Sequence, residues 1–360
     1  MKHWEDNTCL KFEQAGTLQM SNYIMIRGDR SGCFSMIGRV PGLMRPQILN
    51  LGRGCVSRGT VVHEIGHAIG FFHEQSRSDR DQHIRILWHN INSNMRSQFA
   101  KASDNTYGVP YDYSSVMQYR EWAFQADPEK NTIVTVDPLM QLLLGNTELS
   151  FRDKQTANAM YHCDANCPNV NEVKCENGGY MFQRYGSTSK CSCICPPNTA
   201  GELCEILLDR GYYEPLKCGG NITTEGPIQT PNAPYTTFPD GGCVFWIQAP
   251  EGKVARVDFS DFSFQSRRLS PRNPLAGRKC PRERVEIRTS SLFEGKVYCS
   301  NDLAKKSVTS TKRDMVIIAS AKHSGYPGGF RAMVSFVNES LVAPSKEITG
   351  PIGILNSIFG

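Results

Sequence analysis

Three histidines and a glutamate are concentrated in residues 61–74, where the sequence reads VVHEIGHAIGFFHE. On a helix, His63 and His67 are four residues apart, so both rings project from one face and can share a metal ion. Gly70 can adopt a left-handed conformation that turns the chain sharply, which brings His73 back as a third ligand. Three neutral imidazoles with an open fourth position suit catalytic Zn²⁺, whereas structural zinc sites are closed and usually contain cysteine.

Glu64 lies beside the first of these histidines and can act as a base toward a water on the metal. The alternative is that the histidines are satisfied core residues with an accidental spacing. The complete pattern would arise by chance in about one of 50,000 such chains, so we favour the metal site. The other five histidines, at positions 3, 83, 89, 162 and 323, have no such spacing, and we interpret them as structural or surface residues.

The spacing H-E-x-x-H-x-x-G-x-x-H is the zinc signature of the metzincins. Glu74, directly after the third histidine, resembles the astacin family, and residues 111–119, YDYSSVMQY, resemble the Met-turn of that family. The resemblance implies that Met117 packs under the zinc site. It also implies that Tyr119 is a fifth, displaceable zinc ligand that swings to stabilise the oxyanion. Gln118 replaces the family's usual histidine, with little expected effect because this residue is not a ligand.

The same resemblance implies a zinc endopeptidase with one Zn²⁺ per chain. In its mechanism Glu64 takes a proton from the zinc-activated water that attacks the peptide carbonyl, and then passes this proton to the leaving amine. Tyr119 and the zinc stabilise the tetrahedral oxyanion. The resemblance implies that the substrate is an extracellular protein.

The first residues, MKHWEDNTCLKF, contain no apolar segment of a signal peptide. In terms of the resemblance, the chain begins within the first helix of the catalytic domain, so we expect a signal peptide, a propeptide and the first strand upstream. In astacins the residue that matches Glu74 is buried and anchors the ammonium group of the mature N-terminus. Without that ammonium group we expect Glu74 to be an unpaired buried carboxylate, which is energetically costly.

The cysteines indicate how the rest of the chain positions these residues. The chain has 360 residues and 14 cysteines, and this number of cysteines indicates disulfides and an oxidising compartment. The cysteines fall into three even blocks, at 9, 33, 55 and 163, at 167, 175, 191, 193, 195 and 204, and at 218, 243, 280 and 299. They predict a catalytic domain at 1–163, a module at 164–205 that is too small for its own core, a domain at 218–338 and a tail at 339–360. Sequons at Asn221 and Asn338 agree with a secreted glycoprotein.

The second and third blocks resemble extracellular modules. Residues 164–205 resemble an EGF-like module through the sequence CENGGY and the C-x-C spacing. The rival interpretation, a zinc cluster, is disfavoured because CxxC pairs are absent. Residues 218–338 resemble a CUB domain, and their alternating apolar runs suggest a β-sandwich. The resemblances imply the disulfides Cys9–Cys163, Cys33–Cys55, Cys167–Cys191, Cys175–Cys193, Cys195–Cys204, Cys218–Cys243 and Cys280–Cys299.

The expected fold class is therefore multidomain. It combines an α+β metzincin-type catalytic domain that lacks its first strand, a small disulfide-rich EGF-like module and an all-β CUB sandwich. Some CUB domains bind Ca²⁺ through three acidic residues, but the matching positions here are Gln265, Glu283 and Ala321. Since only one carboxylate is present, we expect no calcium site.

The charge and the hydropathy of the chain limit the classes of partner that it could bind. Eight Lys or Arg residues between Arg267 and Arg288 form either a solvated loop or a patch for acidic glycans or matrix. The net charge of +5 is too small to indicate a nucleic-acid partner. No apolar run is long enough to span a membrane.

The leading prediction is a secreted, extracellular zinc endopeptidase that cleaves extracellular or matrix proteins, with a domain order similar to that of the nematode astacins. The alternative is a non-catalytic extracellular binding or adhesion protein that acts through its EGF-like and CUB modules. The intact set of three histidines, Glu64 and Tyr119 argues against this alternative.

Overall fold

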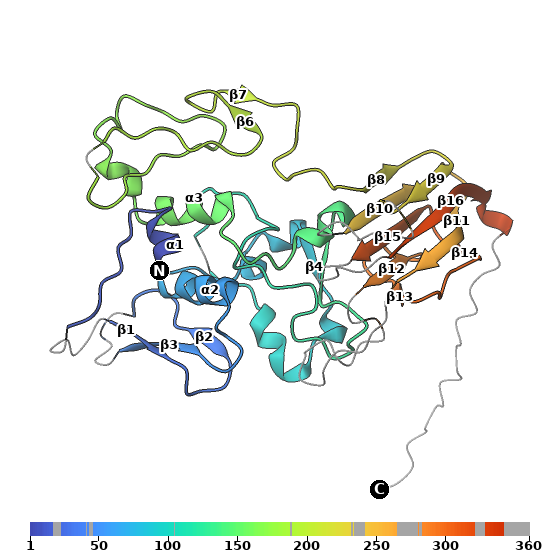
Figure 1. Cartoon of the computed structure of the whole chain (residues 1–360), viewed down its shortest axis with the longest axis horizontal. Coiled ribbons are helices and arrows are strands. Elements are labelled where there is room, and N and C mark those ends of the chain that lie inside the picture. The colour runs from blue at the N-terminus through green and yellow to red at the C-terminus, as the bar shows by residue number, and fades with distance from the viewer. Residues whose placement is uncertain are drawn as a thin grey trace, which may run out of the picture. The chain divides into compact units, whose positions relative to one another are not determined.

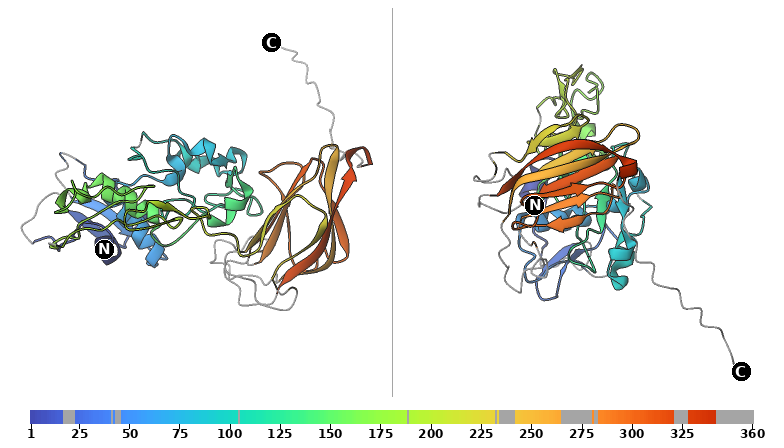
Figure 2. Two further views of the ribbon diagram at one scale, coloured as in Figure 1. Left: turned by 90° about the horizontal axis from the view of Figure 1, so that it is seen from above. Right: turned by 90° about the vertical axis from the view of Figure 1, so that its right-hand side faces the viewer.

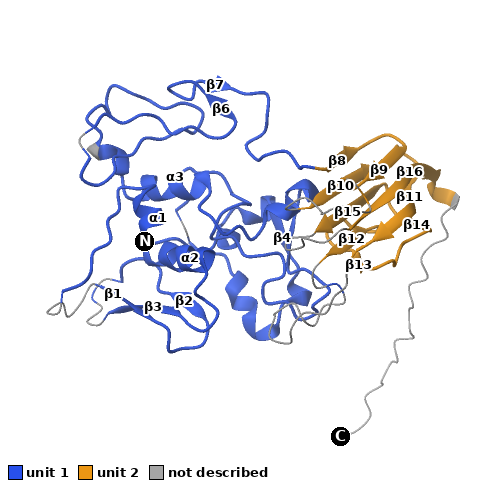
Figure 3. Ribbon diagram, in the orientation of Figure 1, with its two compact units in different colours: residues 1–217, 268–281 blue, residues 218–267, 282–360 orange. Residues whose placement is uncertain are grey.

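The computed structural model describes residues 1–16, 23–40, 42, 46–103, 105–187, 189–231, 233, 242–264, 280, 283–320 and 328–341. The chain forms two compact units, residues 1–217 with 268–281 and residues 218–267 with 282–360 (Figure 3). The module predicted at 164–205 belongs to the same unit as the domain predicted at 1–163, and the boundary between them stays a prediction. All of the candidate metal ligands lie in the first unit.

The first unit combines helices with small sheets. Its described α-helices are α1 (Lys2–Glu5), α2 (Arg58–Ala68) and α3 (Phe151–Met160). Its described strands are β1 (Ile24–Arg27), β2 (Cys33–Ser35), β3 (Gln47–Leu51), β4 (Ile84–Ile86), β5 (Ile133–Thr135), β6 (Thr199–Ala200) and β7 (Ile206–Leu207). Short 3₁₀ helices are Glu74–Ser76, Arg80–Gln82, Trp88–Asn90, Ser93–Phe99, Pro138–Leu143 and Cys163–Asn166.

The sheet of the first unit has the order β1-β3-β2, and β1 is parallel to β3 whereas β2 is antiparallel to it (Figure 1). Helix α2 packs against β2 and β3. The strands β4 and β5 form a separate antiparallel pair, as do β6 and β7. Because β3 leads through a short connection into α2, the sheet fixes the start of the helix that carries the first two histidines.

An apolar core holds α2 in place on its inner face. Trp4 is fully buried, its Nε1 donates a hydrogen bond to the Val62 carbonyl at 3.1 Å, and its ring lies 5.4 Å from that of Phe71. A Cβ atom added at Gly66 would lie 2.7 Å from the Met117 sulfur. The glycine therefore lets the Met117 side chain pack directly on the helix backbone, with no room for a larger residue.

Disulfides tie the first unit together. They join Cys9–Cys163, Cys33–Cys55, Cys167–Cys191, Cys175–Cys193 and Cys195–Cys204, which are the pairs that the resemblances imply. The bond between Cys9 and Cys163 spans 154 residues, so it restricts the unfolded chain more than the shorter loops do. The small module at 164–205 has little regular structure, which agrees with a fold that depends on its three bridges.

The second unit is a β-sandwich, whose two sheets form separate layers in Figure 2. Its strands are β8 (Gly219–Ile222), β9 (Gly226–Gln229), β10 (Cys243–Gln248), β11 (Lys253–Ser263), β12 (Arg284–Arg288), β13 (Lys296–Tyr298), β14 (Lys306–Thr309), β15 (Asp314–Ser320) and β16 (Gly329–Asn338), and a 3₁₀ helix covers Glu339–Leu341. One sheet has the order β13-β12-β15-β10-β8 and the other β14-β11-β16-β9. The multidomain fold class expected from the sequence, with an all-β third part, is confirmed.

Several features predicted for residues 218–338 can be located. Cys218 and Cys243 form a disulfide, and Cys280 and Cys299 are both disulfide-bonded as well. The two sequon asparagines, Asn221 in β8 and Asn338 at the end of β16, are exposed. Of the three positions compared with CUB calcium ligands, Glu283 is buried, and Gln265 and Ala321 lie outside the described residues.

The predicted basic patch between Arg267 and Arg288 needs a correction. Arg284 is 7% exposed and Arg288 is fully buried. Both lie in β12, a strand that pairs with β13 and with β15. Arg288 Nε donates to Glu286 Oε1 at 2.7 Å on the same face of β12. Neither arginine is available to an external glycan, and the other six cations of the segment lie outside the described residues. None of the helices in the described part of the chain combines the length and apolar character needed to cross a bilayer.

Candidate metal centre

Two of the candidate ligands come from helix α2 and the third from the chain that follows it. Ser57 caps the start of the helix by accepting a hydrogen bond from the Thr60 amide at 3.3 Å. The helix ends after Ala68, and Gly70 has a φ of 111°, a conformation that residues with a side chain rarely adopt. The chain therefore reverses at the glycine of the sequence pattern and returns His73 beside the helix.

The three imidazole rings converge on one point. His73 Nε2 lies 3.3 Å from His63 Nε2 and 3.1 Å from His67 Nε2. The ligand atoms of the three residues all lie within 4.8 Å of one another, and they form the one cluster of potential metal-binding side chains found among the described residues. The structure thus brings together the three histidines that the sequence predicts as ligands.

The tautomers of His63 and His67 follow from the hydrogen bonds that their Nδ1 atoms make. His63 Nδ1 lies 2.8 Å from the Val116 carbonyl, and His67 Nδ1 lies 2.8 Å from the Phe71 carbonyl. Because a carbonyl oxygen can only accept, both Nδ1 atoms carry the proton, and both Nε2 atoms present a lone pair. Burial lowers the pKa of His63, lowers that of His67 to about 4, and lowers that of His73 well below its usual value, so the rings are kept neutral.

This arrangement fits a zinc ion. The Nε2 atom of His73 lies 3.1–3.3 Å from those of the other two rings, so one cation could be shared by all three. Nitrogen ligands at a Zn–N distance of about 2.1 Å and tetrahedral angles are about 3.4 Å apart, close to the observed spacing. Three histidine ligands leave a fourth position open, which is the composition of a catalytic rather than a structural zinc site.

Glu64 is buried beside this cluster. Glu64 is 4% exposed, and its Oε2 atom has no hydrogen-bond partner among the residues that the structure describes. Burial raises the pKa of the Glu64 carboxyl to about 7. A carboxyl group in this state can accept a proton and release it again near neutral pH, as a general base requires.

Tyr119 lies on the other side of the third ligand. Its ring centroid is 4.3 Å from that of His73, and burial together with the nearby Glu64 carboxylate raises the pKa of its hydroxyl. The Tyr119 amide donates to Gln75 Oε1 at 3.0 Å, which fixes the backbone at this point. The hydroxyl therefore stays protonated near neutral pH and remains a hydrogen-bond donor close to the metal site.

The turn that precedes Tyr119 contacts the chain segment that carries the third ligand. Met117 is fully buried, and its carbonyl accepts a hydrogen bond from the Glu74 amide at 3.1 Å. Gln118 is buried, accepts from the Tyr111 hydroxyl at 2.5 Å and donates to the Tyr119 carbonyl at 3.0 Å. Its amide therefore connects two parts of the turn, and it does not point to a metal ligand.

Asp153, near the start of α3, holds the same turn. Its carboxylate accepts from Ser115 Oγ at 2.6 Å and from the Val116 amide at 2.9 Å. It also completes a capping box with Ser150 at the start of the helix. Burial and the neighbouring Asp112 raise the pKa of Asp153 to about 6. The carboxylate thus fixes the Val116 carbonyl that in turn orients His63.

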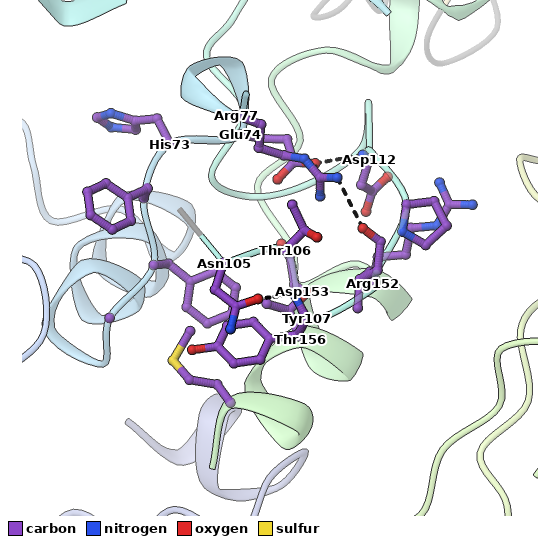
Figure 4. Close-up of a pocket in the computed structure, with 16 residues that line it drawn as sticks. His73, Glu74, Arg77, Asn105, Thr106, Tyr107, Asp112, Arg152, Asp153 and Thr156 are labelled. Atoms are coloured by element: carbon purple, nitrogen blue, oxygen red, sulfur yellow. Dashed lines mark hydrogen bonds and ion pairs between the residues drawn. The ribbon is translucent and has the colours of Figure 1, made fainter. Parts of the chain in front are cut away.

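Glu74 lines a cavity of about 260 Å³ next to the metal cluster. Figure 4 shows Glu74, Arg77, Asp112 and Arg152 around this cavity. Glu74 Oε1 accepts from the Asp112 amide at 2.7 Å and lies 3.4 Å from Arg77 Nη1. Burial raises the pKa of Glu74 to about 8, and the Arg77 guanidinium offsets part of this effect.

The expectation that Glu74 is unpaired is therefore wrong. Arg77 follows it by three residues, in the turn after the 3₁₀ helix Glu74–Ser76, and its guanidinium is a charged partner for the Glu74 carboxyl. The Arg77 side chain is only 8% exposed and also donates to Asp79 and to the Val109 carbonyl.

Sequence reasoning missed the charged residues that support the site, namely Arg77, Asp112, Arg152 and Asp153. One of them carried a recognisable signal, because Ser150 and Asp153 form an S-x-x-D capping pattern before an α-helix. Asp112 and Arg152 make contacts across long stretches of sequence. Arg77 contacts Glu74 from only three residues away, but the motif gives no indication of this pair.

Comparison with known proteins supports the assignment of the first part of the chain. Residues 1–162 match the model of a peptidase family that is described as Astacin. The chain is 35% identical over 335 residues to the Protein SpAN of Strongylocentrotus purpuratus, a match that covers 89% of this chain and 50% of that protein. It is 40% identical over 273 residues to the zinc metalloproteinase nas-36 of Caenorhabditis elegans, covering 73% of this chain and 42% of that protein.

Among solved structures, the chain is similar to high choriolytic enzyme 1, a hatching enzyme zinc-protease from Oryzias latipes. The two are 34% identical with a TM-score of 0.41, and the match covers 45% of this chain and 79% of that chain. The chain spans about half the length of the curated relatives that it matches.

Proposed function

The chain belongs to the astacin family of metallopeptidases, and on this premise we propose that it is a secreted zinc endopeptidase that cleaves extracellular proteins. The observation that carries the proposal is the convergence of three histidine Nε2 atoms next to the buried carboxylate of Glu64. Two exposed sequons, at Asn221 and Asn338, support a secreted glycoprotein.

In the proposed site His63, His67 and His73 hold one Zn²⁺. When bound, the zinc lowers the pKa of a water to about 7 and polarises a substrate carbonyl. Glu64 takes the proton from the attacking water and delivers it to the leaving amine. The Tyr119 hydroxyl donates a hydrogen bond to the substrate oxygen as negative charge develops on it.

Glu74 and the adjacent cavity have a structural part in this proposal. We assign to Glu74 the binding of an ammonium group, in line with the family resemblance, and Arg77 is its partner when no ammonium is present. The cavity of about 260 Å³ has room for the end of a peptide chain as well as water. Met117 supports the ligands from the core side through its contact with Gly66.

The proposed function predicts a peptidase that depends on one zinc ion per chain. The purified full chain should digest casein, lose this activity with 1,10-phenanthroline and regain it with added Zn²⁺. Elemental analysis should find zinc in the parent and in His89→Ala, which changes an exposed histidine, but not in His67→Ala. A parent that binds zinc but cleaves no protein, or that is active after zinc removal, would contradict the proposal.

The role of Tyr119 predicts a selective loss of turnover. Tyr119→Phe should lower kcat for a peptide substrate by about 100-fold, because it removes one hydrogen-bond donor to the transition state. KM should change by less than about threefold, since the hydroxyl acts mainly after charge has developed. Steady-state kinetics of this variant, compared with Tyr185→Phe at a tyrosine that is 64% exposed, measure the effect. A rise in KM with kcat unchanged would assign Tyr119 to substrate binding instead.

A further inference from the structure

The segment that follows the small disulfide-rich module packs back on the first unit through two adjacent tyrosines. The guanidinium carbon of Arg152 lies 3.7 Å from the ring centroid of Tyr212 and 5.6 Å from that of Tyr213. The Tyr213 ring is 5.7 Å from that of Tyr113, which lies near the start of residues 111–119. Tyr213 also packs against the apolar cluster that contains Phe99, Tyr111 and Tyr113.

The Tyr213 hydroxyl uses its full hydrogen-bonding capacity at this point. It accepts from the Tyr113 amide at 3.0 Å and from Arg152 Nη1 at 3.1 Å. Its proton can be donated to Asp112 Oδ1 at 3.1 Å, with the Tyr111 carbonyl at 3.4 Å as a weaker alternative. A phenol has one donor and two acceptor positions, so all of them have a partner here.

The backbone that this hydroxyl holds leads directly to the candidate site. The Asp112 amide donates to Glu74 Oε1 at 2.7 Å, and Glu74 follows the ligand His73. The Ser115 amide donates to the Asp112 carbonyl at 3.2 Å, at the start of the turn that contains Met117 and Tyr119. Asp112 and Arg152 also line the cavity beside Glu74.

We propose that Tyr213 is a positioning residue for the proposed peptidase reaction, which fixes residues 111–113 and through them Glu74 and the Met-turn. The expected effect of Tyr213 on turnover rests on the proposed function, whereas its effect on the order of residues 111–113 does not. Burying an aromatic ring needs no hydroxyl, whereas this hydroxyl connects three backbone or side-chain groups of residues 111–113 with Arg152. The catalytic region is thus held in part by a residue that lies beyond both the predicted catalytic domain and the predicted EGF-like module.

The test compares Tyr213→Phe with Tyr185→Phe in the full chain, since both remove a hydroxyl and keep the ring. Amide hydrogen exchange is measured by mass spectrometry on peptides that cover residues 111–116 and helix α2. We expect exchange in residues 111–116 to be about fivefold faster or more in Tyr213→Phe, because the Tyr113 amide loses its acceptor. Exchange in α2 should match the parent, and Tyr185→Phe should match it in both peptides. No change in residues 111–116, or equal acceleration in both peptides, would overturn the proposal.

A kinetic measurement then tests whether this order serves the reaction. In an active parent, Tyr213→Phe should lower kcat about fivefold with KM unchanged, because the reacting groups are less well placed. Faster exchange without any change in kcat would overturn the positioning role. If the parent itself hydrolyses no peptide, the proposed function fails, and the exchange data still decide whether the Tyr213 hydroxyl orders residues 111–116.

Discussion

Glu64→Gln is expected to lower kcat/KM for peptide hydrolysis by about 10²–10⁴-fold, with zinc content unchanged. Glutamine has the same shape as glutamate but cannot take up and release a proton at neutral pH. Glu64 is not one of the three converging ligands, and its Oε2 has no hydrogen-bond partner among the described residues. Removal of its charge therefore breaks no observed contact, and it also relieves the desolvation that raises the carboxyl pKa to about 7.

Three measurements on the parent, Glu64→Gln and the exposed control Glu172→Gln separate chemistry from folding. Zinc stoichiometry and the thermal unfolding midpoint should be equal or higher in Glu64→Gln, since a buried carboxyl is replaced by a neutral amide. Only its rate should fall, and Glu172→Gln should behave as the parent throughout. If Glu64→Gln cleaved at the parental rate, another group would have to be the base, and the assignment of the mechanism would be wrong.

The metal ligands could be predicted because their geometry is local. A four-residue spacing on a helix and a glycine that leaves it define three positions within eleven residues, and the structure has Gly70 at a φ of 111° in this role. The groups that orient these ligands could not be found in the same way. The Val116 carbonyl is 53 residues from His63, and the Asp153 carboxylate that fixes Val116 is 37 residues further on.

Two expectations were wrong for different reasons. Glu74 was expected to be unpaired because its only partner known from the family is an ammonium group, whereas Arg77, three residues further along, lies 3.4 Å from its carboxyl. Arg284 and Arg288 were counted as surface cations because they lie in a basic stretch of sequence. Both lie in the paired strand β12 and are buried, and charge density along a chain does not show which residues will form such a strand.

Asp153→Ala is expected to destabilise the first unit and to weaken zinc binding together. The carboxylate accepts three hydrogen bonds, from Ser115, Val116 and the Ser150 amide, at 2.6, 2.9 and 2.9 Å. Without it, buried amides on α3 and on the Met-turn lose their acceptor, at a total cost of about 3–5 kcal/mol. This corresponds to a decrease of roughly 10 °C in the unfolding midpoint for a unit of this size.

The coupling to zinc is what distinguishes Asp153 from an ordinary buried polar residue. Its bond to the Val116 amide fixes the carbonyl that accepts from His63 Nδ1, so its loss should also release the ring of that ligand. Partners of this kind typically change metal affinity by about 10–100-fold, which competition with a chromophoric chelator can measure. Asp164→Ala, at an exposed aspartate in the same unit, should change neither quantity. A destabilised Asp153→Ala chain that binds zinc as tightly as the parent would limit Asp153 to capping α3, and the orientation of His63 would then have to come from Val116 and the core alone.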